Sequence, residues 1–431
     1  MHDSRVPGND TTSSDLTLRR GPVASIAVAG IAAIGVICVA LAQKPSIPAV
    51  TPAPAASFAV DLVARGAALA AIGDCAVCHT AKSGRPFAGG RPVTTPFGVI
   101  YATNITPDAD TGIGAWSEQA FRRSLREGVD RDGQYLYPAF PYPHFTHATD
   151  QDIEALYAFL MTRAPVSAKL PPNGIAFPLN IRMLLAGWDW LFLRTGEWRP
   201  NPSRSADENR GAYLVETLGH CGACHTPLDV LGAEQRSKAF RGGEAEGWDA
   251  PALQAATPAR APWTVESLTD YLRNGFTPGH GAAAGPMREV TDELARAPVE
   301  DVRAIAVYFV SLMGGATAKP ASRAIEQDAV FDGACAGCHA PGSPSRQLGA
   351  PSLAAGAAVN APSPRDAIQT ILKGIPWREG RAGPFMPGFA AELSDRQVAH
   401  LVEYLRASFG NGPAWTDVEK EVRRARDEGG S

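Results

Sequence analysis

The five residues CAVCH at positions 75–79 occur in two further versions, CGACH at 221–225 and CAGCH at 335–339. Each copy reads Cys-x-x-Cys-His, the pattern of covalent attachment of c-type haem. Two thiols add to the porphyrin vinyl groups, and the histidine that follows reaches the iron. Zinc sites normally combine two cysteine pairs, and thioredoxin-like pairs need no such histidine. The repetition therefore predicts three molecules of haem c in one chain.

The predicted haem residues form two sets. The cysteines expected to attach haem are Cys75, Cys78, Cys221, Cys224, Cys335 and Cys338. The histidines expected on the iron are His79, His225 and His339. Because the one remaining cysteine, Cys38, lies in an apolar N-terminal stretch, we expect no disulfide in the rest of the chain.

Helical stretches surround each motif. Those before the first two motifs both open with Arg-Gly-Ala, at 65–67 and 210–212. Amphipathic stretches with an aromatic residue near the end follow the motifs at 152–160, 301–310 and 396–409. Apolar side chains three residues apart share one face of a helix. The pattern predicts an all-α chain of three consecutive haem domains, each burying its own core.

The N-terminus predicts export. Residues 22–42 carry no charge and follow Arg19 and Arg20. A helix of that length spans roughly 30 Å, so the segment is expected to be a transmembrane helix or a signal peptide, with the chain beyond residue 45 outside the cytoplasm. The net charge of −4 and the absence of a long basic run do not favour a nucleic-acid partner.

Composition and motif spacing divide the chain into seven segments. The expected order is a signal peptide or membrane anchor at 1–44, a Pro/Ala linker at 45–57, a haem domain at 58–165, an apolar connector at 166–204, haem domains at 205–318 and 323–410, and a charged, solvated tail at 411–431. The connector is tryptophan-rich but too interrupted by charge to span a bilayer. Two interpretations stay open for it, a buried brace and a surface that docks on a membrane or partner.

Methionine is a common second axial ligand of haem iron. Met287 and Met386 lie beside glycine and proline in loops that precede the last helix of the second and third domains. We therefore expect each of them to close the sixth position of one iron. The alternative is a loop methionine that fills a gap in a core.

The first domain has no methionine in the corresponding stretch, PAFPYPHFTHATD at 138–150. His144 is the expected sixth ligand there, since Pro143 and Phe145 would hold it in a stiff loop. His147 is the alternative, and an open iron site is a third possibility. Two histidines on the iron would lower the potential of this haem below that of the other two.

These features resemble the triheme cytochrome c subunits of membrane-bound bacterial dehydrogenases that oxidise alcohols, aldehydes, gluconate or sorbitol. The resemblance is carried by the three motifs and by strings such as GGRPVTTPFGVIYATNITPD (89–108), RGAYLVETLGHCGACHTP (210–227) and GPM (285–287). The PYPHFT string (141–146) is similar to the branch that accompanies molybdenum hydroxylases such as nicotinate or isoquinoline dehydrogenase.

The resemblance implies three cytochrome c-like domains on the periplasmic side of the cell membrane. It also implies electron transfer from a dehydrogenase large subunit, through three haems, to ubiquinone or a terminal oxidase of the respiratory chain. Substrate oxidation would belong to the partner. Two other functions remain: a peroxidase-like haem enzyme with an open first haem, and a cytochrome subunit of a terminal oxidase.

Overall fold

The computed structural model describes residues 42–254, 262–314, 327–347, 350–378 and 383–429. The described residues from Pro45 onward form one compact unit. The apolar segment at 22–42, with its predicted membrane or signal role, lies outside the described residues except for Ala42. Among the helices that the structure does describe, none combines the length and apolar character needed to cross a bilayer.

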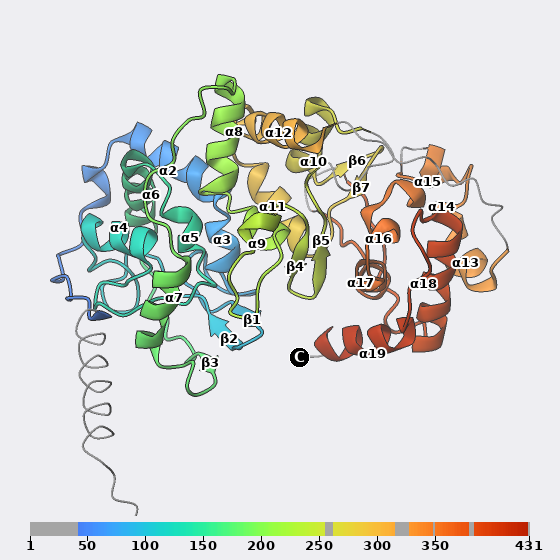
Figure 1. Ribbon diagram of the computed structural model, residues 1–431, viewed down its shortest axis with the longest axis horizontal. Helices are drawn as coiled ribbons and strands as arrows, with labels where there is room; N and C mark the ends of the chain where they lie inside the picture. Colours follow the sequence, from blue (N-terminus) through green and yellow to red (C-terminus); the bar gives the residue numbers. More distant parts are fainter. Residues whose placement is uncertain (1–41, 255–261, 315–326, 348–349, 379–382, 430–431) are drawn as a thin grey trace, which may run out of the picture. The chain divides into compact units, whose positions relative to one another are not determined.

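The first domain is built on a pair of helices, α2 (Val60–Ile72) and α6 (Asp150–Met161). They cross at Gly66, where an added Cβ would lie 1.9 Å from the carbonyl oxygen of Ala155. Beside the crossing, Arg65 Nε donates to Asp152 Oδ1 at 2.8 Å. The Arg-Gly-Ala sequence therefore supplies an ion pair and a site of close backbone approach. Figure 1 shows α2 and α6 side by side.

The second domain repeats this arrangement with α8 (Ala206–Glu216) and α12 (Val299–Met313). A Cβ on Gly211 would lie 2.0 Å from the Ala304 oxygen. Arg210 binds Asp301 with two hydrogen bonds, at 2.7 and 3.0 Å. The Arg-Gly-Ala sequence shared by α2 and α8 thus forms the same kind of helix crossing in both domains.

In each domain, short helices and antiparallel hairpins lie between the two long helices. The hairpins depart from the all-α fold that we predicted. In the first domain these elements are α3 (Cys75–Cys78), β1 (Pro92–Thr95), β2 (Gly98–Tyr101), α4 (Glu118–Glu127) and α5 (Tyr142–Phe145), with β3 (Gly174–Ile175) paired to β2. In the second they are α9 (Gly222–His225), β4 (Gly243–Ala245), β5 (Trp248–Ala250), α10 (Val265–Asn274), β6 (Phe276–Thr277), β7 (Gly281–Ala282) and α11 (Pro286–Leu294). Strands of two to four residues are too short to show an alternating pattern in the sequence.

The third domain has a core of its own. Its helices are α13 (Ala329–Ala334), α14 (Ala336–His339), α15 (Pro344–Gln347), α16 (Ala357–Asn360), α17 (Arg365–Lys373) and α18 (Asp395–Phe409). Val398, Leu401 and Val402 of α18 are fully buried there. In place of an arginine pair, His400 Nε2 donates to Asp328 Oδ2 at 2.5 Å.

The charged tail is not fully solvated, contrary to our expectation. It forms α19 (Val418–Gly429), which buries Val418, Val422 and Ala425 against the third core. Arg426 anchors the helix by an ion pair of 2.6 Å with Asp395. The balanced charges occupy its outer face.

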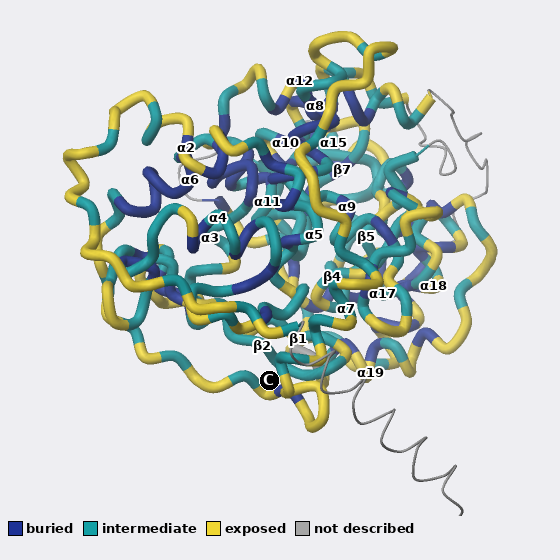
Figure 2. The backbone as a smooth tube through the Cα atoms, turned by 60° about the vertical axis from the view of Figure 1, so that its left-hand side comes forward, coloured by how far each residue is buried: buried dark blue, intermediate teal, exposed yellow. Residues whose placement is uncertain are grey.

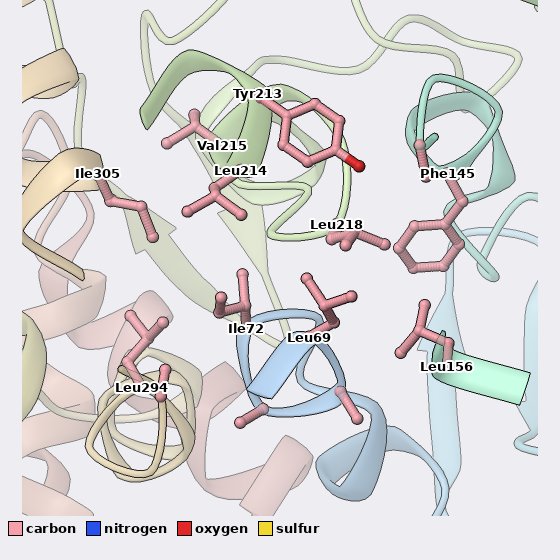
Figure 3. Packing of buried hydrophobic residues seen from close by; sticks show 14 of the residues in the cluster. Leu69, Ile72, Phe145, Leu156, Tyr213, Leu214, Val215, Leu218, Leu294 and Ile305 are labelled. Atoms are coloured by element: carbon pink, nitrogen blue, oxygen red, sulfur yellow. The ribbon is translucent and has the colours of Figure 1, made fainter. Parts of the chain in front are cut away.

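The first two domains share one hydrophobic core, where we expected two. Figure 3 shows Leu69 and Ile72 of α2 facing Leu214 of α8 and Leu218 beyond it. Leu294 and Ile305 of the second domain belong to the same cluster. The tube coloured by burial shows buried positions along α2, α6, α8 and α12 (Figure 2). The two crossings therefore stabilise each other.

The connector has one packed face and one exposed face. Its elements are the turn η2 (Arg182–Leu184) and helix α7 (Leu185–Phe192). Trp188 packs edge-on against Tyr142, whose hydroxyl donates to Asp189 Oδ1 at 2.6 Å. Trp190 is 81% exposed. The connector therefore has features of both a brace against the first domain and an exposed surface for docking.

Gly66→Ala and Gly211→Ala should each lower the free energy of unfolding by about 1–3 kcal/mol, because the added methyl group collides with a backbone carbonyl that cannot move independently. Gly187→Ala in α7 is the matched control, since its Cβ would meet no atom within 4 Å. Denaturant unfolding followed by circular dichroism measures the change. Equal stability of all three variants would contradict the close crossing.

Candidate functional site

Each motif forms a short helical turn directly after the opening helix of its domain. The turns are α3, α9 and α14. Cysteines three residues apart lie on the same side of such a turn, so both thiols of a pair can reach one ligand. The first turn is preceded by Asp74 in the left-handed region (φ 54°), and the second by His220 (φ 36°).

The histidines of the first two motifs are oriented by backbone carbonyls. His79 Nδ1 donates to the Thr103 oxygen at 2.6 Å, and His225 Nδ1 donates to the Pro251 oxygen at 2.7 Å. This bond fixes the ring and leaves Nε2 as the nitrogen for a metal. Burial lowers the pKa of both rings, which favours the neutral imidazole that a metal requires. The arrangement fits axial ligands of haem iron.

The accepting carbonyls explain the presence of the hairpins. Thr103 follows β2, and Pro251 follows β5. Each hairpin thus brings a loop carbonyl to the ring of the histidine that ends the neighbouring motif. In the third motif, Nδ1 of His339 is buried and has no hydrogen-bond partner within the described ranges.

The motif thiols do not resemble a redox-active pair. Burial raises the pKa of Cys75 and Cys78 to about 12, although Cys78 keeps exposed surface. It also raises the pKa of Cys221 to about 12 and that of Cys224 to about 11. Catalytic Cys-x-x-Cys pairs need a lowered pKa. These four thiols are therefore protonated at neutral pH, which argues against a thioredoxin-like role for the first two motifs.

Met287 lies in the first turn of a helix, where we expected a loop, and Met386 lies in a loop as expected. Met287 is the second residue of α11 and packs partly buried on the shared core. Before it, Gly285 (φ 53°) lets the ring of Trp248 approach, because an added Cβ would lie 2.4 Å from that ring. Met386 exchanges two backbone hydrogen bonds with Ile375, at 2.8 and 2.9 Å. Both methionines are thus fixed in position.

Equivalent backbone hydrogen bonds in the first two domains identify the residue of the first domain that corresponds to Met287. In the second domain Ala283 N donates to the Gly275 oxygen at 2.8 Å, and in the first Leu136 N donates to the Gly128 oxygen at 2.7 Å. Both glycines end a helix in the left-handed conformation. Four residues beyond the donors lie Met287 and Phe140. In this backbone register Phe140, whose phenyl ring cannot bind iron, therefore corresponds to Met287.

His144 lies between the first two domains. Its Nδ1 donates to the Glu216 oxygen at 3.0 Å, and its Nε2 pairs with Glu234 Oε1 at 2.5 Å. Burial alone would lower the pKa of His144, but Glu234 holds it above its ordinary value. A Cβ on Gly222 of the second motif would lie 3.1 Å from the His144 ring. Both ring nitrogens are thus engaged by protein, beside the second motif.

His147 faces the connector. Its Nδ1 donates to the Gly196 oxygen at 2.6 Å, and its backbone oxygen accepts from Trp198 N at 2.9 Å. The geometry of this ring, with Nδ1 on a carbonyl, is the same as that of His79 and His225.

The sequence analysis assigned no role to His220, which contacts the residues before the first motif. Its Nε2 donates to the Gly73 oxygen at 3.3 Å, directly before the first motif. Burial lowers the pKa of His220 to about 4. The first two motifs are thus in contact through their preceding residues. His220 directly precedes Cys221, as Asp74 directly precedes Cys75. This shared position was the sequence feature that could have indicated its role.

Two family models match the chain. The model described as cytochrome c matches residues 63–164, and the model described as cytochrome c oxidase, cbb3-type, subunit III matches residues 323–405. The first and third motifs fall within these matches.

Curated relatives cover most of the chain. A nicotinate dehydrogenase subunit of Pseudomonas putida is 46% identical over 93% of this chain, and the chain spans only 35% of that protein's length. The gluconate 2-dehydrogenase cytochrome c subunit of Pantoea cypripedii is 38% identical, covering 85% of this chain and 89% of its own. The fructose dehydrogenase cytochrome subunit of Gluconobacter japonicus is 34% identical, covering 84% and 82%.

Proposed function

Because the chain belongs to the family of cytochrome c subunits of bacterial dehydrogenases, we propose that it carries electrons from a dehydrogenase large subunit, through three haems, to ubiquinone or a terminal oxidase. The observation that carries the proposal is the shared geometry of His79 and His225, each held by a carbonyl on Nδ1. Oxidation of the organic substrate belongs to the partner.

The residues that would hold the haems follow from the motifs. Each haem would be attached through the two cysteines of one motif and bound by the histidine after them. Bound haem supplies reversible one-electron chemistry. The chain's own contribution is to fix the histidine rings, to exclude water with the shared core, and to hold the attachment turns in contact through His220 and Gly73.

Contacts between the domains support a relay. Hairpin β4–β5 reaches the first domain through Glu246, which binds Arg91 at 3.0 Å. It reaches the third domain through Asp249, whose backbone N donates to Asp366 Oδ1 at 2.8 Å. We propose that the first two haems form a close pair and that the third joins them on the side of this hairpin.

For the sixth iron ligands we propose Met287 and Met386 in the second and third sites. In the first site His144 can serve only after its Nε2 releases Glu234, and His147 is the alternative. Phe140 at the methionine position favours a second candidate function, in which the first haem is open and acts as a peroxidase-like centre.

An exposed apolar surface supports a membrane partner on the periplasmic side. Trp188 Nε1 donates to the Leu231 oxygen at 3.0 Å, which joins the connector to the loop at 228–231. We call this region the connector patch. Its exposed large apolar residues are Phe177, Leu179, Ile181, Leu184, Trp190, Leu191, Leu228, Val230 and Leu231. Patches of this kind mark membrane or protein contacts, and a quinone acceptor resides in the bilayer.

Pyridine haemochrome analysis should give three haems per chain. Replacing Cys335 and Cys338 together by alanine should reduce the count to two, because the third site then has no thioether bond. Cys38→Ala, outside the motifs, is the control and should leave three. A wild-type count of two would overturn the assignment of one motif.

Met287→Leu and Met386→Leu should each remove a thioether-to-iron charge-transfer band and open one reduced haem to carbon monoxide, since leucine offers no sulfur. Met313→Leu, at the end of α12, is the control. The carbon monoxide capacity of the wild-type protein decides between the two functions. Binding at one haem would support the open first site, and no binding would support a six-coordinate carrier.

Trp190→Ser combined with Val230→Ser should weaken binding of residues 45–431 to phosphatidylcholine vesicles about tenfold, because two side chains that are 81% and 91% exposed lose their apolar surface. Val60→Ser is the control, since Val60 is 82% exposed but lies on α2, outside the connector patch. Sedimentation with vesicles measures the partition. Wild-type protein that stays in solution would exclude a membrane role for this surface.

A further inference from the structure

Asp74 is a partly buried residue at the entrance to the first motif. It joins α2 to α3 and directly precedes Cys75. Its backbone is left-handed (φ 54°), a conformation that Asp and Asn tolerate better than most residues. Its Oδ1 is buried and lacks a hydrogen-bond partner in the part of the chain that the structure describes. A carboxylate in this position is poorly stabilised.

Charged groups face Asp74 from three neighbouring elements. Glu289 and Glu293 come from α11, Glu246 comes from the β4–β5 turn, and Arg91 comes from the loop before β1. Four carboxyl groups, including that of Asp74 itself, therefore lie near the guanidinium of Arg91.

Other carboxylates occupy that guanidinium. Arg91 Nη1 binds Glu289 at 2.8 Å, and Nη2 binds Glu246 at 3.0 Å. Glu293 pairs with Arg296 at 2.6 Å. Burial first, and then the charges of Glu293 and Glu289, raise the pKa of Asp74 to about 7, against the opposing effect of Arg91. Asp74 thus changes charge near neutral pH, where an ordinary aspartate stays ionised.

The cluster lies beside the attachment points of two haems. Arg91 Nη1 also donates to the oxygen of Val77, inside the first motif, at 3.4 Å. The charges of Asp74 and Glu246 act on both Cys78 and Cys224. A change of charge at Asp74 is therefore sensed at the first motif and at the second.

We propose that Asp74 is a proton-exchanging group coupled to oxidation of the haem that Cys75 and Cys78 attach, a role that rests on the proposed function. Asp74 would release its carboxyl proton to water when that haem passed an electron to the neighbouring haem. The carboxylate left behind would then balance the positive charge gained on oxidation. Asp74 is a positioning residue for charge and does not bind the iron.

The sign of the coupling follows from this balance. At low pH Asp74 is neutral and favours neither oxidation state. As pH rises through its pKa the carboxylate forms and stabilises the ferric haem, so the midpoint potential falls. Once Asp74 is ionised in both redox states, the potential becomes independent of its proton again.

Spectroelectrochemical titration of the haem-loaded full chain from about pH 5 to about pH 9 tests the proposal. In the wild type, at least one of the first two haems should show a potential that falls across neutral pH. Asp74→Asn should lose that fall, and because Asn also adopts left-handed backbone, the variant should fold. Asp61→Asn is the control: it removes the same charge from an exposed site at the other end of α2, about 20 Å away.

Glu246→Gln provides an independent check. It removes one charge that raises the pKa of Asp74 and releases Arg91 toward it, so the fall should persist and move to lower pH. The proposal is overturned if the midpoint potential of the wild type does not fall across neutral pH. It is also overturned if Asp74→Asn keeps that fall, because the titrating groups would then be others, such as the haem propionates. Haemochrome analysis of the same samples separates these outcomes from failure of the proposed function, in which no c-type haem would be found.

Discussion

Helix α2 passes α6 at Gly66, and α8 passes α12 at Gly211, with no room for a single methyl group between each glycine and the facing carbonyl. The attachment turns α3 and α9 begin only a few residues after these helices end. The direction in which each turn presents its thiols is therefore set by the crossing behind it. Arg65 with Asp152, and Arg210 with Asp301, fix the rotation of the helices about the contact.

Much of this could be predicted from short-range patterns. The motifs fix chemistry within five residues, and the repeated Arg-Gly-Ala opening indicates a repeated crossing. The contacts that we did not predict join residues far apart in sequence. The hairpin carbonyls of Thr103 and Pro251 are backbone groups and have no signature of their own. The partners of His144 come from another domain, and nothing near His144 in the sequence indicates them.

Hairpin β4–β5 shows how few residues connect the three motif regions. The loop after it orients His225, while Glu246 at its turn reaches Arg91 of the first domain. Glu244 binds Arg365 of α17 at 2.5 Å, so the same short hairpin also contacts the third domain. Charged side chains make most of these contacts. Their strength depends on which neighbours are ionised, and the junction therefore links domain docking to local electrostatics.

The common core of the first two domains can form only late in folding, because it joins segments that are far apart in the sequence. Leu69 and Ile305 belong to one cluster although most of two domains separates them in sequence. Such distant pairs close slowly, since the intervening chain must be ordered first. A newly synthesised polypeptide thus exposes the apolar face of α2 until the second Cys-x-x-Cys-His region has emerged and folded. During that interval the nascent chain is most open to proteases and aggregation.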